Sequence, residues 1–337
     1  MQIRFLYPLT VFLLMVISQA AFAVSGEDAK PSHTYKLDGA LKNKFEYATE
    51  IGTSRFTVRN SRVGITGDID GVYGYRVQVE LSDEGQFKPL DLSATIKPVK
   101  GLSFTLGQTS IPLFNTYIVS PSEMMFANRA FIGKYFVSTR DLGLLTRYDF
   151  RVGEVPTRLE FGVYNGHAIN NPVWKKKKSY GGRVTVGSMT GARLSAKVYN
   201  YPNNEQTHHL FYGADLRYEA SNWKVESEVM KRESKTDFHT DLLSYYLQGS
   251  YVLPLKTKLF NNMVPALRWD GISDTQGDAG FEVKRLTAGL GFGSSRGRVS
   301  SILRVDYEWY FVTNSPTIFK SPEVGSDKIT VELLLRF

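Results

Sequence analysis

The chain has 337 residues, with 41 lysines and arginines against 33 acidic residues, no cysteine, and 42% hydrophobic residues. This apolar content excludes an intrinsically disordered chain, and the absence of cysteine excludes zinc fingers, thiol enzymes and disulfide scaffolds. A net charge of +8 is compatible with a nucleic-acid partner, so the compartment has to be established before the charge can be interpreted.

The first 23 residues have the pattern of a secretory signal peptide. Arg4 precedes an apolar run from Phe5 to Ile17, and the small-residue site Ala21-Phe22-Ala23 follows that run. We therefore expect residues 1–23 to be cleaved from the mature chain, which would begin at Val24 with a short periplasmic tail over 24–34. Because the mature chain is exported, we expect no nucleic-acid partner.

Beyond this tail, apolar and charged residues alternate with a period of two in segments of about 10 residues. The charges fall opposite the aliphatic and aromatic residues in the segments 37–47, 73–81, 223–229, 299–311 and 329–337. Aromatic residues such as Tyr47, Trp309 and Phe337 stand at segment ends, as in the interfacial girdles of membrane barrels. A soluble β-sandwich would also alternate, but its apolar faces would be aliphatic and would pack against each other. The pattern therefore favours a membrane barrel.

Sixteen segments are predicted as strands, with boundaries accurate to about two to four residues. In chain order they are 35–48, 54–68, 71–82, 87–98, 101–110, 141–150, 157–165, 180–188, 191–200, 209–219, 222–231, 240–253, 260–270, 282–293, 297–311 and 327–337. Short and long links alternate, as periplasmic turns and outer loops do in outer-membrane barrels, so both termini should be periplasmic. The expected fold class is all-β: a transmembrane antiparallel β-barrel of sixteen strands, forming one domain over 35–337.

The third long connection, residues 111–140, is out of scale with the others. It contains apolar residues such as Leu113, Phe114, Phe126 and Phe131, and a loop of that length and composition should not lie in external water. We expect it to fold inward and pack on the barrel wall. Since a barrel of sixteen strands otherwise leaves an aqueous lumen, this third outer loop would form a constriction.

The charges assigned to the inner face are more often basic than acidic, which favours anions, and charges at a constriction count most. The candidate anion-selectivity residues are Arg129, Lys134 and Arg140 on the loop, with Lys42, Lys44, Arg62 and Arg76 on the early strands. The alternative is that many of these cations only pair with carboxylates in the lumen.

A second basic cluster follows Trp174 in a predicted outer loop. Its members are Lys175, Lys176, Lys177 and Lys178. Four adjacent lysines could draw anions toward the mouth or bind the phosphates of lipopolysaccharide. The alternative is that they form only a solvated face of the loop.

Several short elements, taken in their order along the mature chain, carry a resemblance to a known family. They are the 58–67 strand with Arg59 and Arg62, the 102–108 strand with Gly107-Gln108, the loop element Asn128-Arg129-Ala130-Phe131, Arg140-Asp141-Leu142-Gly143, the segment ending Tyr164-Asn165-Gly166, and the terminal strand. In these elements the chain resembles the phosphate-selective porins O and P. The resemblance implies a trimeric sixteen-stranded porin that passes anions, with a phosphate site built in some members from loop lysines and lumen arginines. Here the loop carries one lysine, Lys134.

The sequence thus predicts an outer-membrane porin for passive diffusion of small hydrophilic solutes, with a preference for anions and with phosphate as a candidate. Expected partners are outer-membrane lipid, lipopolysaccharide, small anions and two further copies of the chain. The alternatives are a barrel with an occluded pore that acts in binding or adhesion, and a barrel hydrolase. The histidines, at 33, 167, 208, 209 and 239, show no Ser-His-Asp or metal-ligand spacing, so we expect no enzyme, catalytic residue, metal or cofactor.

Overall fold

The computed structural model describes residues 32–337 except 84, 116–119, 168, 189, 275–279, 315–318 and 320–323. The predicted signal peptide and residues 24–31 of the predicted tail lie outside these residues. The first strand already begins at His33, two residues before the predicted start of the barrel. No helix in the described part of the chain is long and apolar enough to cross a membrane.

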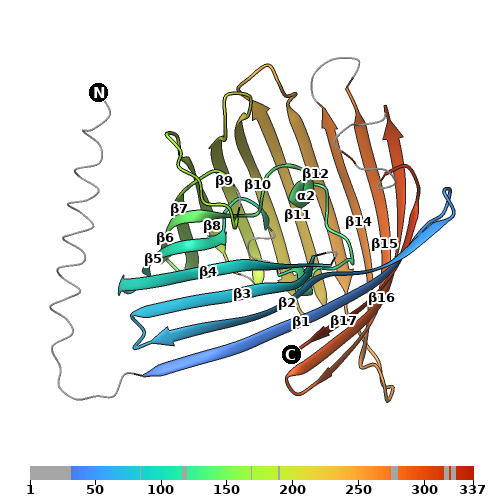
Figure 1. The fold of residues 1–337 in the computed structure, drawn as a ribbon. Coiled ribbons are helices and arrows are strands. Elements are labelled where there is room, and N and C mark those ends of the chain that lie inside the picture. The colour runs from blue at the N-terminus through green and yellow to red at the C-terminus, as the bar shows by residue number, and fades with distance from the viewer. Residues whose placement is uncertain are drawn as a thin grey trace.

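The strands form a single antiparallel sheet that closes on itself (Figure 1). They are β1 (His33–Ala48), β2 (Thr53–Ile69), β3 (Tyr73–Asp83), β4 (Gln86–Val99), β5 (Leu102–Ser110), β6 (Arg140–Val152), β7 (Val155–Tyr164), β8 (Ser179–Gly187), β9 (Gly191–Pro202), β10 (His208–Ala220), β11 (Trp223–Ser234), β12 (Leu242–Tyr251), β13 (Leu253–Pro254), β14 (Asn262–Asp274), β15 (Glu282–Arg296), β16 (Val299–Thr313) and β17 (Lys328–Arg336). β12 and β13 pair with the same neighbour, β14, and act as one interrupted strand. β1 pairs with β17, so the predicted barrel of sixteen strands is confirmed.

The outer face of the barrel is apolar around its circumference. Strands on all sides expose large apolar side chains, among them Leu37, Val77, Leu106, Leu159, Leu194, Leu216, Leu247, Leu290 and Leu333. Charged side chains such as Arg183, Asp215 and Arg268 are instead buried on the inner face. A soluble protein would show the opposite distribution, whereas a barrel in lipid needs this one.

The third loop, residues 111–139 between β5 and β6, packs against the inner wall from β7 to β15. Its apolar residues, including Phe114, Phe131 and Phe136, share a buried cluster with Tyr199 of β9 and Phe211 of β10. The rings of Phe136 and Phe211 lie 6.1 Å apart. The described part of the loop includes two short helices, η2 (Pro121–Glu123) and α2 (Ile132–Tyr135), and Figure 1 shows α2 beside β12. That side of the lumen is therefore filled.

Charged side chains of the wall hold the backbone of this loop. Five basic residues donate to loop carbonyl oxygens over 2.8–3.2 Å: Lys42 to Ala127, Arg183 to Phe114, Arg268 to Asn128, Arg285 to Arg129 and Arg304 to Met124. Three carboxylates accept from loop amides: Glu228 from Asn115, Asp306 from Ala127 and Asp270 from Phe131. Buried backbone groups need such partners. Much of the lumen charge therefore holds the loop rather than facing solvent.

Asp215 lies at the centre of one such network, which contacts the loop at Phe114 and Asn115. Its carboxylate accepts from Arg183 at 2.8 Å, Lys197 at 2.8 Å and Arg193 at 3.3 Å, and all four side chains are almost fully buried. Arg183 also donates to the Phe114 carbonyl, and Arg193 donates to the Asn115 side chain. Asp215 therefore compensates Arg183 and Arg193, the two cations of this network that hold the loop.

Strand β2 carries a bulge that reverses which residues face the lumen. Its pairing with β3 shifts around Asn60, whose φ of 59° is a left-handed conformation that asparagine tolerates. Toward the short-turn end of the barrel, the even-numbered Arg62 faces inward. Toward the long-loop end, the odd-numbered Arg55 and Arg59 face the lumen, while Phe56 is 86% exposed on the outer surface.

Strand β4 contains a matching irregularity at the same level of the wall. Asp91 lies opposite Gln78 and Pro89 lies opposite Val79, so Leu90 is an extra residue on β4. As a result Lys88 turns into the lumen. Gln108 of β5 supports this bulge by donating to the Leu90 carbonyl at 2.9 Å.

Gly107, next to Gln108, should tolerate no side chain. Its φ is 130°, and an added Cβ would lie 2.3 Å from the Leu92 carbonyl oxygen. We expect Gly107→Ala to lower the free energy of unfolding by about 1–3 kcal/mol, because both the backbone and the packing become strained. Denaturant unfolding of the detergent-solubilised barrel measures this. Gly74→Ala is the control, since its Cβ would meet only ordinary contacts; equal losses in both variants would contradict the prediction.

Removing the Asp215 charge should destabilise the anchored loop. We expect Asp215→Asn to cost about 3–5 kcal/mol of unfolding free energy, because it leaves buried cations uncompensated. The control is Asp149→Asn, which breaks a pair with Arg158 whose side chains are both more than one third exposed, and should cost less than about 1 kcal/mol. Similar unfolding midpoints for the two variants would show that Asp215 does not carry this role.

Candidate functional site

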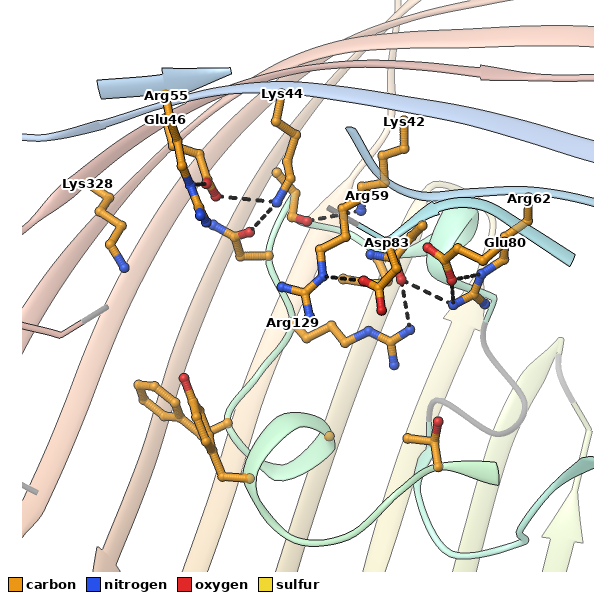
Figure 2. A pocket seen from close by; sticks show the side chains of 18 of the residues that line it. Lys42, Lys44, Glu46, Arg55, Arg59, Arg62, Glu80, Asp83, Arg129 and Lys328 are labelled. Carbon is orange, nitrogen blue, oxygen red and sulfur yellow. Dashed lines mark hydrogen bonds and ion pairs between the residues drawn. The ribbon is translucent and has the colours of Figure 1, made fainter. Parts of the chain in front are cut away.

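A cavity of about 730 Å³ lies between the third loop and the wall formed by β1 to β4, at the barrel end that carries the long loops. Ten basic side chains of the described residues line it: Lys42, Lys44, Arg55, Arg59, Arg62, Lys88, Arg129, Arg140, Arg285 and Lys328. Only three carboxylates among the described residues do so: Glu46, Glu80 and Asp83. Figure 2 shows most of these side chains gathered beneath β1 and β2. The basic excess is thus concentrated at the loop.

The two arginines on either side of the β2 bulge each have an acidic partner on β3. Arg62 lies 3.0 Å from Glu80, and Arg59 lies 3.4 Å from Asp83. These pairs orient the guanidinium groups, and the Arg59 and Asp83 side chains remain about one third exposed. Asn60 accepts from Arg62 at 3.2 Å and connects this group to the loop.

Arg129 is the basic residue that the third loop contributes next to this pair of arginines. Its guanidinium donates to Asn60 at 3.5 Å, and its carbonyl is held by Arg285. No carboxylate partner of Arg129 occurs among the residues that the structure describes. Burial, and then the charges of Arg62, Arg140 and Arg59, lower the pKa of Arg129 to about 9, so it keeps its charge at neutral pH. Arg129 is therefore the lining cation with which a bound anion would pair.

Three other predicted constriction residues, Lys42, Lys44 and Arg140, have partners in the wall. Lys42 contacts Glu332 at 3.1 Å, and Lys44 contacts Glu46 at 3.3 Å. Arg140 pairs with Asp91 at 2.8 Å, beside the β4 bulge. These three residues are therefore paired lumen charges, as the alternative interpretation predicts, and all three also line the cavity.

Five of the seven predicted constriction residues therefore meet at one cavity: Lys42, Lys44, Arg62, Arg129 and Arg140. The structure does not bring Arg76 there, because Arg76 sits nearer the short-turn end and donates to Asp38 and Thr66. Lys134 lies in α2, and its side chain is outside the part of the chain that the structure describes.

Five lining cations among the described residues were not among the predicted site residues: Arg55, Arg59, Lys88, Arg285 and Lys328. Arg55, Arg59 and Lys88 were missed because strict alternation assigns them to the outer face, and the two bulges reverse that assignment. Pro89 is a signal that could have revealed the β4 bulge, since proline within a sheet is confined to edges, strand starts and bulges. Asn60 gives no comparable signal.

The predicted outer-mouth lysines lie in the connection between β7 and β8. Lys175 donates to the Gly166 carbonyl at 2.9 Å and to Asn203 at 2.6 Å, and partial burial lowers its pKa. Lys178 donates to Asn165 at 2.8 Å. Lys176 and Lys177 are exposed. Two of the four lysines thus brace the loop, and two face outward.

The described residues contain no group of three or more histidines, aspartates or glutamates that could hold a metal ion. His209 and His239 do lie close, with ring centroids 5.2 Å apart, at the mouth of the barrel.

No family model matches the sequence, and no curated protein matches it. Membership of the phosphate-selective porins therefore stays a prediction. Solved structures that are similar include OmpT, an outer membrane protein of Vibrio cholerae in its trimer form (TM-score 0.64, 9% identity, 91% of this chain and 100% of that chain). An anion-selective porin from Comamonas acidovorans (0.62, 14%, 90% and 99%) and the outer membrane channel DcaP of Acinetobacter baumannii (0.60, 12%, 91% and 98%) are also similar. At these identities the likeness concerns the fold, which is that of outer-membrane porins and channels.

Proposed function

We propose that the protein is an outer-membrane porin through which small hydrophilic solutes diffuse passively, with a preference for anions. The observation that carries this proposal is the cavity beside the third loop, where ten basic side chains face three carboxylates and Arg129 has no carboxylate partner among the described residues. The barrel fold supplies the passage in which such a cavity would select ions.

The geometry explains how selection would work. An anion that enters from the long-loop end meets guanidinium groups whose N–H donors can replace part of its hydration shell. The low dielectric of the surrounding wall strengthens each uncompensated charge. Arg129 stays in place because Asn60 and Arg285 hold its side chain and its carbonyl. The donors are thus arranged before the ion arrives, and no loop ordering has to accompany passage.

Phosphate is one anion that this arrangement suits, because guanidinium forks match phosphate oxygens geometrically. We propose further that the barrel assembles as a homotrimer in the outer membrane of a Gram-negative type of cell, as the resemblance to the phosphate-selective porins implies. The trimer form of the similar OmpT barrel supports this assembly. The exposed Lys176 and Lys177 would contact lipopolysaccharide phosphates. The proposal includes no catalysis and no cofactor.

The sign of ion selectivity tests the main proposal. We expect the reversal potential of the purified protein in planar bilayers under a KCl gradient to show preference for chloride, because the cavity is basic. Arg129→Gln should move that potential toward zero, whereas Arg76→Gln, which removes a charge paired with Asp38 away from the cavity, should change it much less. Cation selectivity of the unaltered protein, or no conductance at all, would refute the proposal.

Competition by phosphate tests whether the cavity binds phosphate in particular. If phosphate binds in the cavity, millimolar phosphate should reduce the chloride current, and Arg59→Gln should weaken that block more than Arg158→Gln does. Arg158 is the control because it pairs with Asp149 and does not line the cavity. A chloride current unaffected by phosphate would leave a general anion porin.

A further inference from the structure

We propose that this cavity prefers organic anions with a flat apolar body, such as aromatic carboxylates, over small anions of the same charge. The inference rests on the proposed anion-porin function and adds a substrate class to it. It arises from a feature that charge alone does not require: one wall of the cavity is lined with aromatic rings.

The rings that line the cavity are Phe131, just before α2, Tyr135 in α2 and Tyr310 in β16, and packing holds them. Tyr135 of α2 lies against Phe319 with ring centroids 4.4 Å apart, and Phe131 meets the same ring edge-on at 5.7 Å. Tyr135 and Tyr310 are both half-buried and line the cavity. The ring positions are therefore set before any solute arrives, which reduces the entropy lost on binding.

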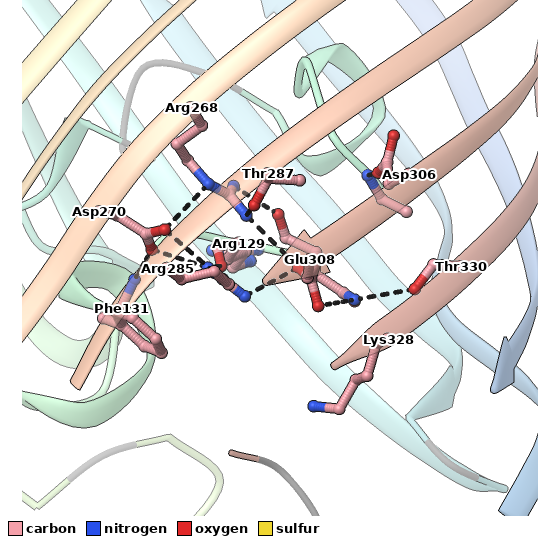
Figure 3. Close-up of polar contacts among 12 residues, drawn as sticks. Arg129, Phe131, Arg268, Asp270, Arg285, Thr287, Asp306, Glu308, Lys328 and Thr330 are labelled. Carbon is pink, nitrogen blue, oxygen red and sulfur yellow. Dashed lines mark hydrogen bonds and ion pairs between the residues drawn. The ribbon is translucent and has the colours of Figure 1, made fainter. Parts of the chain in front are cut away.

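Cations alternate with these rings along the wall. The Arg285 guanidinium lies 4.5 Å from the centroid of Phe131 and 5.6 Å from that of Tyr310, and the Lys328 ammonium lies 4.8 Å from Tyr310. The Tyr310 hydroxyl donates to Glu308 at 3.0 Å, and this hydrogen bond helps to fix the ring. Figure 3 shows the neighbouring Phe131, Arg285, Glu308 and Lys328. Cation–π contacts of this kind help to hold the rings in place at the edge of the cavity.

The arginines occupy another side of the same cavity. Figure 2 shows Arg59, Arg62 and Arg129 together below β2, with α2 lower in the view. A carboxylate that binds these guanidinium groups would leave the rest of an organic anion directed into the cavity toward the rings. The cavity volume of about 730 Å³ falls within the range of about 300–1,000 Å³ typical of pockets that hold small organic ligands.

The arginine side of the cavity acts on a solute through charge, and the aromatic side adds contact with apolar rings. Chloride or acetate would interact with the cations on both sides of the cavity but would gain little from contact with the rings. An aromatic carboxylate would use both walls, and ring–ring contacts add to the gain from burying apolar area. We expect the added contact to strengthen binding of benzoate relative to acetate by about threefold to tenfold.

The experiment compares benzoate with acetate as blockers of the chloride current through the purified, reconstituted full-length protein. The quantity measured is the half-blocking concentration of each salt, expressed relative to the chloride conductance of the same preparation. The result expected is a half-blocking concentration for benzoate about threefold to tenfold lower than for acetate. Equal values for the two salts would overturn the inference.

Substitutions assign the effect to the rings. Tyr310→Leu should bring the ratio between acetate and benzoate close to one, while Tyr310→Phe, which keeps the ring and loses the hydroxyl, should preserve it. Tyr135→Leu removes a ring from α2 instead, and it should lower the same ratio. It serves as a second test because loss of the Tyr310 hydrogen bonds could disturb the barrel. A ratio unchanged in both leucine variants would place the preference elsewhere and overturn the assignment to this wall.

The reversal potential and the block by benzoate and acetate distinguish failure of the anion porin from failure of the aromatic-carboxylate preference. Cation selectivity in the KCl gradient would refute the anion porin, and the substrate class with it. Anion selectivity together with equal block by benzoate and acetate would leave the porin intact and refute the aromatic-carboxylate preference alone.

Discussion

The structure depends on hydrogen bonds between charged side chains of the barrel wall and the backbone of the third loop. A segment of that length placed inside a barrel leaves peptide groups that cannot all reach water, and each unsatisfied group would be costly. Lys42, Arg268, Arg285 and Arg304 supply donors to its carbonyls, and Asp270, Asp306 and Glu228 supply acceptors for its amides. Because these partners come from strands on several sides of the barrel, the loop is held in one position.

That anchoring makes the lumen asymmetric. The apolar part of the loop fills the side facing β7 to β15, where Phe136 packs on Phe211. The wall from β1 to β4 keeps an open cavity, which cations such as Arg62 and Lys88 line together with Lys42 and Arg285, two cations that also hold the loop. The lumen charges thus divide into two groups. One group balances buried opposite charges and backbone dipoles, and the other faces solvent and can act on solutes. Net charge over the whole lumen therefore says little about selectivity.

The cavity also owes its character to irregularity in the sheet. A regular β2 and β4 would direct Arg55, Arg59 and Lys88 to the lipid side, where a charged side chain is costly. Bulges at Asn60 and Leu90 turn them inward. The same bulge places the Asn60 side chain between Arg62 and Arg129, so the feature that adds cations to the wall also ties that wall to the loop.

Alternation and loop length in the sequence were sufficient to determine the barrel, its sixteen strands and the exceptional third connection, because strand periodicity is a local property and one face had to meet lipid. They also placed Lys42, Lys44, Arg62, Arg129 and Arg140 among the candidate residues. Only the tertiary structure decided which lumen charges have partners, because those partners are far apart in the chain. Arg285 donates to the Arg129 carbonyl, and Lys42 contacts Glu332. It also decided that Arg59 faces inward and Arg76 lies elsewhere, because a bulge depends on pairing between strands, which a single strand's sequence does not contain.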